Sequence, residues 1–594
     1  MIGGPLLRLC SEAARHAGAA KAKSPAPPRP QIIGGMRTLL TIAIATASLA
    51  TASLAAGTSA AEEAFPVAIR VDAAKPLGEL KPVWRFFGAD EPNYATMKDG
   101  KKLLAELGEL KPGQVFFRAH SLLCTGDGTP ALKWGSTNAY TEDAEGRPVY
   151  DWRIVDAIFD TYLARGVRPY AQIGFMPQAL SVKPEPYQHA WTPKAKYDEI
   201  YTGWAYPPKD YAKWEELVFQ WAKHCVEKHG AEEVARWYWE TWNEPNIGYW
   251  RGTRDEFYIL HDRAIRAVRR ALPTAKVGGP DVAGGAGGKY LGEFLTHCLQ
   301  AGTPMDFISF HAKGQPRFTD GHVVMGIANQ LRDIDSGFKV VASFPELKAK
   351  PIVIGESDPD GCAACQGPQL GYRNGTMYSS YTAASFARKH ELADRHGVNL
   401  EGALTWAFEF EDQPFFAGFR VLASNGLDLP VMNVFRMFSR MSGQRVAVQS
   451  DAAIPLDDIM RDGVRAQPDV SAMASLDRGK LAVLVWHYHD ADLPGPDADT
   501  ALTVAGLPIT GGEARLQRYV IDQEHSNAFT AWQRLGSPAQ PSPEHYAQLE
   551  KAGHLAAVGA PEVVKIENAT ATLKLKLPRQ AVALLVLEWP PAAK

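Results

Sequence analysis

One glutamate in this sequence of 594 residues stands where catalytic chemistry is expected, at the end of an aromatic segment. In that segment, residues 236–246, bulky aromatics alternate and lead into the turn Asn243-Glu244-Pro245. The proline ends strand hydrogen bonding, and we expect it to hold the backbone of Glu244 extended. A carboxylate at a buried strand end, among Trp rings that can stack on a sugar, is suited to cleaving a glycosidic bond.

A second glutamate, Glu356, follows the β-branched run 352–354 and is expected to end another buried strand. Enzymes that cleave glycosidic bonds use two carboxyl groups, about 5–5.5 Å apart for retention of configuration and roughly 6.5–9.5 Å apart for inversion. Taken alone, Glu356 could equally be a strand-end residue that caps the following helix. The presence of both Glu244 and Glu356 at strand ends favours a catalytic pair.

Eight apolar strand-like runs alternate with helical patterns across residues 82–440. One of the helical patterns, residues 214–225, has a single apolar face. Eight β-then-α units predict an α/β fold, the (β/α)8 TIM barrel, whose active site lies at the carboxyl ends of the strands. Glu244 then ends the fourth strand and Glu356 the seventh. The predicted strands are residues 83–88, 115–120, 169–175, 235–242, 275–278, 307–311, 351–356 and 403–408.

The parts of the chain outside the barrel have a different pattern. Residues 1–61 are predicted to be an N-terminal extension and signal peptide, with the probable start at Met36, because a positive start, an apolar stretch and a small-residue exit follow one another. A transmembrane anchor of similar length fits less well, since the stretch is rich in Ala, Ser and Thr. We therefore expect an exported protein, periplasmic or secreted, that is not held in a membrane after cleavage. The predicted domains are a catalytic barrel at 81–440, an antiparallel β-sandwich at 441–594, and a strand at 62–80 that contributes to the sandwich.

Composition narrows the possible partners. The net charge is −3 and Lys and Arg form no long run, which argues against a nucleic-acid partner. Of the six Cys, only Cys10 precedes the cleavage site, so five remain. Five cysteines are a sparse and odd-numbered set, which does not indicate a disulfide framework. Cys362 and Cys365 could form a redox pair, half of a zinc site or a local disulfide, and a loop disulfide or two plain thiols fits the sequence best. We predict no metal and no cofactor, an oligosaccharide as the ligand, and no particular oligomeric state.

Six short motifs, taken together, resemble those of one family: Trp242-Asn-Glu-Pro-Asn246, Phe87-Gly-Ala-Asp-Glu-Pro-Asn93, Gly174-Phe-Met-Pro177, Phe310-His-Ala-Lys-Gly314, Gly355-Glu-Ser-Asp-Pro359 and Ala531-Trp-Gln-Arg-Leu-Gly-Ser-Pro538. The family is glycoside hydrolase family 39, which contains β-xylosidases and α-L-iduronidases, and the resemblance covers roughly residues 80–590. It implies a retaining double displacement, in which Glu244 is the general acid/base and Glu356 the nucleophile. The chemistry agrees, because the acid must keep its proton until the leaving oxygen takes it and the nucleophile must be ionised.

Other residues at the predicted strand ends are candidates for substrate binding. Asn243 could hold the sugar 2-hydroxyl, a contact that strengthens in the transition state, or could only shape the turn. His120 ends the second predicted strand and His311 the sixth, so both are expected to line the mouth of the barrel as sugar contacts or as structural residues. Trp406 could stack on the sugar or fill the top of the barrel. The residues that follow it and could bind hydroxyl groups are Glu409 and Glu411.

Two cations bear on which sugar is cleaved. Lys313 stands where the xylosidases have Tyr, which looks more like the iduronidase branch, where a Lys meets the substrate carboxylate. Lys313 and Arg420 would favour an acidic sugar through charge-assisted hydrogen bonds, or would only pair with local acids. The local acids in question are Asp358, Glu411 and Asp412.

We predict an exported retaining exo-glycosidase, a β-xylosidase that releases xylose from xylo-oligosaccharides. One alternative is an α-L-iduronidase-like glycosidase or another that acts on uronic acids or arabinose. The others are a non-catalytic carbohydrate-binding protein and an endo-acting enzyme on a polysaccharide. A copy of the Glu-Pro-Asn pattern at residues 91–93 follows Asp90 instead of an Asn, and we expect it to be structural or to touch the edge of the substrate.

Overall fold

The computed structural model describes residues 63–590. The predicted signal peptide and its start at Met36 lie outside these residues. Within the described residues, no helix is both long and apolar enough to cross a bilayer.

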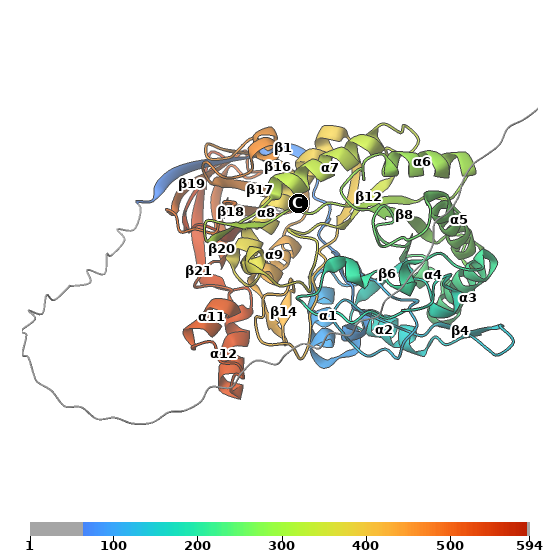
Figure 1. Cartoon of the computed structure of the whole chain (residues 1–594). Coiled ribbons are helices and arrows are strands. Elements are labelled where there is room, and N and C mark those ends of the chain that lie inside the picture. Colours follow the sequence, from blue (N-terminus) through green and yellow to red (C-terminus); the bar gives the residue numbers. More distant parts are fainter. Residues whose placement is uncertain (1–62, 591–594) are drawn as a thin grey trace, which may run out of the picture. The chain divides into compact units, whose positions relative to one another are not determined.

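Eight parallel strands form one sheet, which closes into a barrel (Figure 1). The strands follow one another in the order β13-β12-β9-β8-β7-β6-β3-β2. The two ends meet where the Gly88 amide donates to the Thr405 carbonyl at 3.1 Å and the Thr405 amide to the Phe86 carbonyl at 3.0 Å. The strands are β2 (Phe86–Ala89), β3 (Val115–Ala119), β6 (Val167–Ile173), β7 (Tyr238–Thr241), β8 (Lys276–Val282), β9 (Phe307–His311), β12 (Pro351–Glu356) and β13 (Asn399–Ala403).

The prediction of a TIM barrel is therefore confirmed. Each predicted run overlaps a strand, and two strands, Phe307–His311 and Pro351–Glu356, have the predicted bounds. The last strand differs most, because β13 ends at Ala403, where the predicted strand begins. The apolar run after Ala403 still reaches the barrel, since Thr405 bridges to Phe87 and so closes the sheet.

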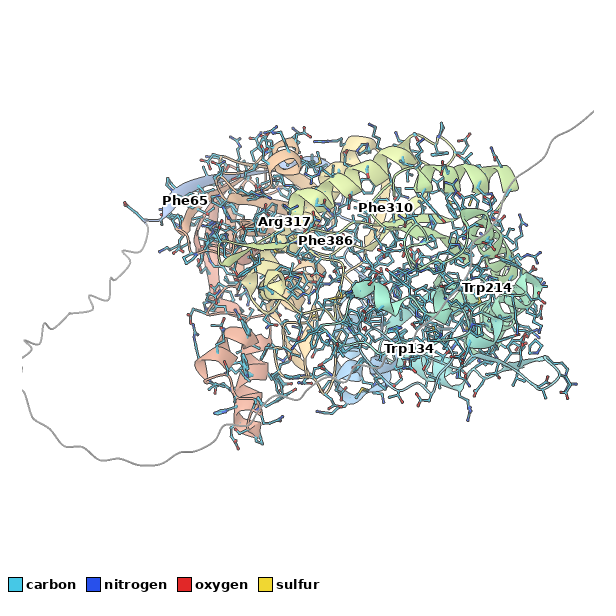
Figure 2. All side chains as sticks on the ribbon, viewed as in Figure 1. Phe65, Trp134, Trp214, Phe310, Arg317 and Phe386 are labelled. Carbon is cyan, nitrogen blue, oxygen red and sulfur yellow. A yellow bond between two sulfur atoms is a disulfide. The ribbon has the colours of Figure 1, made fainter. Side chains whose placement is uncertain are left out.

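Helices cover the outside of the barrel and bury apolar side chains against it. Trp214 of α3 packs on Trp242 with ring centroids 6.4 Å apart, and Phe310 of β9 packs on Phe338 of α7 at 5.8 Å. Trp214 and Phe310 are fully buried in this layer (Figure 2). The helices are α1 (Lys98–Leu110), α2 (Arg153–Leu163), α3 (Tyr211–His229), α4 (Ala231–Val234), α5 (Arg254–Ala271), α6 (Tyr290–Ala301), α7 (Ile327–Ala342), α8 (Thr376–His396) and α9 (Pro430–Ser439).

A second sheet of nine strands is antiparallel apart from one pair, as predicted for the C-terminal sandwich. Its order is β21-β20-β23-β18-β17-β16-β1-β19-β22. Strand β1 precedes the barrel in sequence, yet it pairs with β16 and, in parallel, with β19; Figure 1 shows it in blue beside them. The strands are β1 (Phe65–Glu79), β16 (Gln444–Ser450), β17 (Asp469–Asp477), β18 (Lys480–Tyr488), β19 (Ala498–Ala505), β20 (Gly511–Ile521), β21 (Ala557–Glu567), β22 (Ala571–Leu577) and β23 (Val582–Glu588).

Both faces of this second sheet are covered. In β18, Leu481 lies in an apolar core that the sheet itself encloses, whereas Leu484 and Trp486 belong to the core that continues into the barrel. The division follows from the alternation of side chains along a strand. Ser380 of α8 adds a polar contact by donating to Gln580 Oε1 at 2.6 Å. The barrel and the second sheet therefore share one continuous core.

Shorter elements lie in the loops. A long loop, residues 174–210, connects β6 to α3 and contains the 3-10 helices η2 (Gln178–Leu180), η3 (Tyr197–Ile200) and η4 (Gly203–Ala205). Loops of this length in compact domains are commonly functional. The other short elements are η1 (Pro92–Thr96), η5 (Pro368–Asn374), β4 (Tyr140–Glu142), β5 (Pro148–Tyr150), β10 (Arg317–Thr319), β11 (His322–Val324), β14 (Ala423–Ser424), β15 (Leu427–Asp428), α10 (Leu456–Asp462), α11 (Ala528–Arg534) and α12 (Pro543–Gly553).

Candidate active site

Strand β7 carries the aromatic segment that ends at Glu244. Its side chains alternate, so Tyr238 packs inside the barrel on rings of the neighbouring strands, whereas Trp239 packs outward on helix α3. Trp237, Trp239 and Trp242 are fully buried. The expectation that these rings stack on a sugar is therefore wrong, because they fill the core of the protein.

The backbone turns sharply at Glu244. Its φ is +42°, in the left-handed region that residues with a side chain rarely adopt. The predicted extended backbone is therefore wrong. The Glu244 amide donates to the Asp281 carbonyl of β8 at 3.0 Å, and this bond holds the turn. Strained residues of this kind cluster at functional sites, where the surrounding structure holds them in place.

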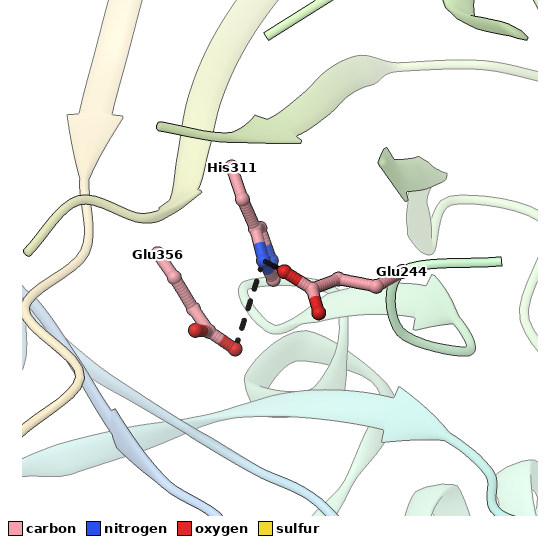
Figure 3. Close-up of side chains that lie close together, drawn as sticks. All are labelled: Glu244, His311 and Glu356. Atoms are coloured by element: carbon pink, nitrogen blue, oxygen red, sulfur yellow. Dashed lines mark hydrogen bonds and ion pairs between the residues drawn. The ribbon is translucent and has the colours of Figure 1, made fainter. Parts of the chain in front are cut away.

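Glu244, His311 and Glu356 come together at the carboxyl end of the barrel strands (Figure 3). One carboxylate oxygen of each glutamate and one ring nitrogen of His311 all lie within 4.8 Å of one another. His311 Nδ1 is 2.7 Å from Glu244 Oε1 and 3.7 Å from Glu356 Oε1. Glu244 is 6% exposed and Glu356 is 3% exposed, so both carboxylates are shielded from bulk water. The structure thus brings three of the predicted site residues into one cluster.

The Lys313 ammonium contacts both carboxylates. Its Nζ lies 3.5 Å from Glu244 Oε1 and forms an ion pair with Glu356. Burial alone would raise the pKa of Glu244, but the charges of Lys313 and His311 outweigh it and hold that pKa well below its usual range. Glu244, His311 and Glu356 have donor atoms that suit a metal ion. The ammonium, however, already supplies a positive charge to both carboxylates, and the absence of a metal stays a prediction.

Arg118, which was not among the predicted site residues, organises the acids behind this pair. It is fully buried, its Nε donates to Glu240 at 2.6 Å, and its Nη2 forms an ion pair with Asp281. Its Nη2 also donates to Asn243 Oδ1 at 3.0 Å. Asn243 Nδ2 is buried and has no hydrogen-bond partner among the described residues. An Arg within the apolar strand β3 was the signal that could have identified it, because buried charges need buried partners.

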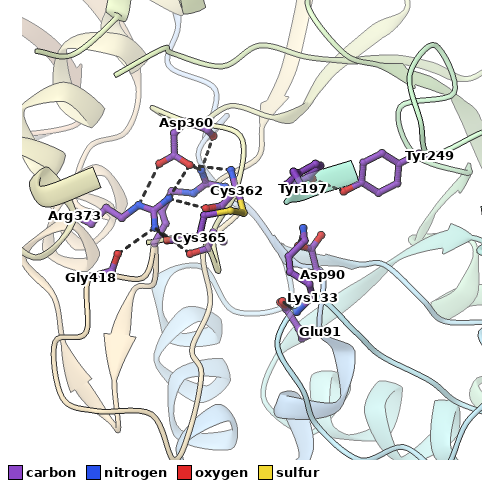
Figure 4. The surroundings of a disulfide bond; sticks show 12 residues. Asp90, Glu91, Lys133, Tyr197, Tyr249, Asp360, Cys362, Cys365, Arg373 and Gly418 are labelled. Carbon is purple, nitrogen blue, oxygen red and sulfur yellow. Dashed lines mark hydrogen bonds and ion pairs between the residues drawn. A yellow bond between two sulfur atoms is a disulfide. The ribbon is translucent and has the colours of Figure 1, made fainter. Parts of the chain in front are cut away.

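His120 connects Glu356 to a second group of charges. His120 Nε2 lies 3.7 Å from Glu356 Oε1, and its Nδ1 lies 2.8 Å from Asp90 Oδ1. Asp90 is paired with the Lys133 ammonium, and both side chains are buried (Figure 4). Burial would raise the pKa of Asp90, but Lys133 and His120 together hold it below its usual range. The copied Glu-Pro-Asn pattern thus lies beside the site through Asp90, while Lys133 comes from a loop in which no local pattern marks it.

A small cavity of about 10 Å³, with room for about one water molecule, lies beside these charges. The hydroxyl of Tyr249, which lines it, is 2.6 Å from the hydroxyl of Tyr197 in the 174–210 loop. Trp406 packs nearby, with its ring centroid 4.3 Å from that of His120. Only 2% of Trp406 is exposed, which agrees better with filling the top of the barrel than with a sugar platform. The residues lining the cavity include Asp90, His120, Lys133, Trp134, Trp204 and Tyr249.

The two glutamates that follow Trp406 have their contacts elsewhere. Glu409 is fully buried and accepts a hydrogen bond from the Gly426 amide at 2.7 Å, and burial raises its pKa to about 8. Glu411 accepts a hydrogen bond from the Asp99 amide at 2.9 Å. Among the described residues, no hydrogen bond or ion pair joins either of them to the two glutamates of the cluster. Their role in binding hydroxyl groups stays a prediction.

Arg420 pairs with local acids, one of the two arrangements that the sequence allowed. Its Nη1 lies 2.7 Å from Asp360 Oδ1, its Nε lies 3.8 Å from Asp358 Oδ1, and its side chain is fully buried. Lys313 does not share these partners but reaches the two glutamates instead. Of the two predicted cations, Lys313 is therefore the one in the site.

Cys362 and Cys365 form a disulfide in the loop after β12 (Figure 4). A local disulfide was one of the predicted arrangements of these two cysteines, and it is the one that the structure shows. Arg373 Nη2 donates to the Cys362 carbonyl at 2.6 Å and its Nη1 to the Cys365 carbonyl at 2.7 Å. The loop runs beside Lys313, because a Cβ on Gly361 would lie 3.7 Å from Lys313 Cδ. It therefore shapes one side of the site.

Proteins similar to this chain include several glycosidases. The model of glycosyl hydrolases family 39 matches residues 67–564. A β-xylosidase of Geobacillus stearothermophilus is 26% identical over 502 residues, which cover 80% of this chain and 87% of the relative. An α-L-iduronidase of Mus musculus is 25% identical over 534 residues, which cover 82% of this chain and 75% of the relative. The crystal structure of a monomeric β-xylosidase from Caulobacter crescentus has the same fold, with a TM-score of 0.69 at 21% identity, over 89% of this chain and 100% of that one. The predicted resemblance is confirmed: the chain belongs to glycosyl hydrolases family 39 and is a glycoside hydrolase.

Proposed function

We propose that this protein is an exported exo-glycosidase that retains anomeric configuration, with Glu244 as the general acid/base and Glu356 as the nucleophile. One observation carries the proposal: an oxygen of each buried carboxylate lies within 4.8 Å of the other. Retaining pairs are about 5–5.5 Å apart and inverting pairs roughly 6.5–9.5 Å apart, because inversion needs room for a water molecule between carboxylate and sugar. The short spacing supports direct attack by a carboxylate.

In the first half of the reaction, Glu244 gives a proton to the leaving oxygen while Glu356 attacks the anomeric carbon. The glycosidic bond breaks, and an ester between the sugar and Glu356 forms. The Lys313 ammonium stabilises the negative charge of Glu356 before the attack. Asn243 Nδ2, buried and without a partner among the described residues, is available to the sugar 2-hydroxyl, a contact that strengthens in the transition state.

In the second half, Glu244 acts as a base. It takes a proton from a water molecule, whose oxygen attacks the anomeric carbon and releases Glu356. Two displacements at one carbon return the sugar with its original configuration. Glu244 thus needs opposite protonation states in the two halves.

The burial of both carboxylates supports exo action on one terminal sugar. Only 6% of Glu244 and 3% of Glu356 is exposed, and among the described residues only a small cavity lies beside them, which favours a closed site. Asp90 offers acceptors and Lys133 offers donors at its wall, the two functions that sugar hydroxyls require. An endo-acting enzyme would instead need an open groove for several sugars.

For the sugar we propose xylose, released from xylo-oligosaccharides. β-Xylosidases of Geobacillus stearothermophilus and Caldicellulosiruptor saccharolyticus match this chain over 87% and 91% of their own lengths.

One observation favours a second candidate, a glycosidase that acts on an acidic sugar. The Lys313 ammonium contacts both glutamates and must shift when a sugar ring comes between them. A sugar carboxylate would give this ammonium a new charge-assisted hydrogen bond, whereas xylose would not. An α-L-iduronidase of Mus musculus at 25% identity is consistent with this candidate.

We also propose export to the periplasm or the medium. The predicted signal peptide motivates this proposal, and the Cys362–Cys365 disulfide supports it, since disulfides persist in oxidising compartments. N-terminal sequencing of the exported protein would check it, because a sequence that still contained residues before Ala61 would contradict the proposed cleavage.

Steady-state rates on aryl glycosides test the proposed activity. We expect turnover of aryl β-xyloside, and we expect Glu356→Gln to lower kcat by about 1,000-fold or more because an amide cannot replace the nucleophile. Turnover of an aryl uronide without turnover of the xyloside would contradict xylose and favour the acidic sugar. Sugar binding without turnover of any glycoside would favour the non-catalytic alternative.

Lys313→Met separates the two sugars further. If Lys313 binds a sugar carboxylate, the variant loses a charge-assisted bond of about 1.5–3 kcal/mol, which raises KM for a uronide by about 10- to 100-fold. KM for a neutral xyloside should change much less. Equal changes for both sugars would exclude carboxylate recognition by Lys313.

A further inference from the structure

The His311 ring lies between two carboxylates. Its Nε2 is 2.6 Å from Asp281 Oδ2, and its Nδ1 is 2.7 Å from Glu244 Oε1. Figure 3 shows the ring directed at Glu244 from the end of β9. Only 1% of His311 is exposed, so both contacts are made away from bulk water. Each ring nitrogen therefore faces an oxygen that accepts hydrogen bonds.

These two contacts determine how many protons Asp281, His311 and Glu244 hold together. A neutral imidazole has one N–H donor and one bare nitrogen, and a carboxylate has only acceptors. If His311 were neutral between two carboxylates, the bare nitrogen would face an oxygen lone pair at hydrogen-bond distance. In the resting site, Asp281, His311 and Glu244 therefore share one proton beyond those of a neutral histidine and two carboxylates.

The surrounding charges decide where that proton rests. Burial would lower the pKa of His311, but the carboxylates of Asp281, Glu356 and Glu244 outweigh it and raise that pKa to about 10. The pKa of Glu244 lies below its usual range, so the resting proton is on the imidazole. The other charged groups that face His311 or its partners are Glu356 at 3.7 Å, Lys313 beside Glu244, Arg118 beside Asp281, and His120 beside Glu356.

This resting state conflicts with the role proposed for Glu244. A general acid must carry a proton when the leaving oxygen departs. The ionised Glu244 has none, and the neighbouring proton on His311 Nδ1 lies across a contact of 2.7 Å. The geometry points to His311 as the source of the missing proton.

We propose that His311 is a positioning residue that stores the proton which Glu244 delivers to the leaving oxygen, with Asp281 holding the ring in its charged state. This inference rests on the proposed acid/base role of Glu244. A sugar that displaces the Lys313 ammonium from Glu244 also favours transfer, because it removes a charge that stabilises the ionised carboxylate.

The protons balance over both half-reactions. In the first, the Nδ1–H bond of His311 breaks and an O–H bond forms on Glu244. That O–H bond then breaks as the leaving oxygen takes the proton, while the glycosidic bond breaks and Glu356 bonds to the anomeric carbon. The products are neutral His311, ionised Glu244, an alcohol and the sugar ester. In the second, a water proton passes to Glu244 and on to His311 Nδ1, as the water oxygen displaces Glu356.

Leaving-group dependence in the full-length protein tests this inference. The substrates are a phenyl glycoside, which needs acid assistance, and a 2,4-dinitrophenyl glycoside of the same sugar, which does not. We expect His311→Gln to lower kcat/KM for the phenyl glycoside by about 100-fold and for the dinitrophenyl glycoside by less than about threefold. Activity on the phenyl glycoside should also be lost at lower pH than in the wild type, because the stored proton no longer persists as pH rises. Equal losses on both substrates, or an unchanged alkaline limb, would overturn the inference.

Two further variants keep the test decisive. Asp281→Asn retains the His311 ring but removes a charge that favours the imidazolium, so the alkaline limb should again move to lower pH, and a fixed limb would count against the proposal. His120→Gln is the matched control, because the His120 ring faces Glu356. This variant should lower kcat/KM by the same factor for both leaving groups. If the wild type hydrolysed neither glycoside of any sugar, the proposed function itself would fail. If the wild type hydrolysed these glycosides but His311→Gln showed no leaving-group dependence, only the proton-storing role of His311 would be rejected.

Discussion

Single residues in this site are held by the balance of buried charges. Lys313 bridges Glu244 and Glu356, and Asp90 is paired with Lys133. A buried charge that loses its partner costs about 3–5 kcal/mol, whereas a paired one contributes little net stability. These pairs are therefore better explained by the chemistry of the site than by stability.

The Asp90–Lys133 pair allows these two roles to be separated. Lys133→Met leaves the buried charge of Asp90 without its ammonium partner and with only the His120 ring beside it, so we expect a loss of about 3–5 kcal/mol in the free energy of unfolding, measured by denaturant titration. The double variant Asp90→Asn/Lys133→Met has no unpaired charge and should regain most of this stability. If the pair binds sugar hydroxyls, KM of the double variant should still be raised by about tenfold or more, the equivalent of one hydrogen bond. Wild-type kinetics in the double variant would show that the pair is only structural.

At the scale of elements, the loops after the barrel strands shape the site. The loop after β12 carries the disulfide and lies beside Lys313. Arg373 of η5 crosslinks the loop through the carbonyls of Cys362 and Cys365, and it also donates to Asp360 Oδ1 at 2.8 Å. Two different devices therefore hold one loop.

The contributions of the disulfide and of the Arg373 hydrogen bonds to the free energy of unfolding predict which of the two matters more. A disulfide that closes so short a loop stabilises by about 2 kcal/mol. Each bond to the buried charge of Arg373 contributes about 1.5–3 kcal/mol, and there are several. We expect Cys362→Ser/Cys365→Ser to lower the free energy of unfolding by at most about 2 kcal/mol and to keep kcat/KM within a few-fold of the wild type. Arg373→Met should lower both the free energy of unfolding and kcat/KM by more than this. Thermal melting and steady-state rates measure this, and the reverse ranking would contradict it.

The barrel strands could be predicted because buried parallel strands appear in sequence as continuous apolar runs. Their ends identified Glu244, Glu356 and His311, since active-site residues of this fold lie at the carboxyl ends of strands. The expectation for the Trp rings of residues 236–242 failed for a related reason. A strand buried on both faces has no side exposed to a ligand, so its aromatics fill the core.

The rest of the site could not be predicted from local patterns. Asp281 lies within β8, which continues past the predicted end at residue 278, so its carboxylate was overlooked. Lys133 and Tyr197 come from long loops, and tertiary contacts alone bring them to Asp90 and to the Tyr249 hydroxyl. Residues of this kind have no periodicity that would mark them.

At the scale of the whole molecule, the barrel and the second sheet act as one body. Strand β1 precedes the barrel in sequence but lies between β16 and β19, and one core cluster continues from the barrel to the inner residues of β18. The strand ends that carry Glu244 and Glu356 therefore belong to a scaffold assembled from most of the described chain. A rigid scaffold keeps two carboxylates at the short spacing that retention requires.

Mass spectrometry of a trapped intermediate tests the central claim most directly. The full-length protein is incubated with the 2,4-dinitrophenyl 2-deoxy-2-fluoro glycoside of the sugar that it hydrolyses fastest. The fluorine slows both displacements, and the leaving group needs no acid, so the sugar ester should accumulate. We predict one added fluoro-sugar per chain, carried by the peptide that contains Glu356. An adduct on a different residue, or no adduct together with a product of inverted configuration, would contradict the account.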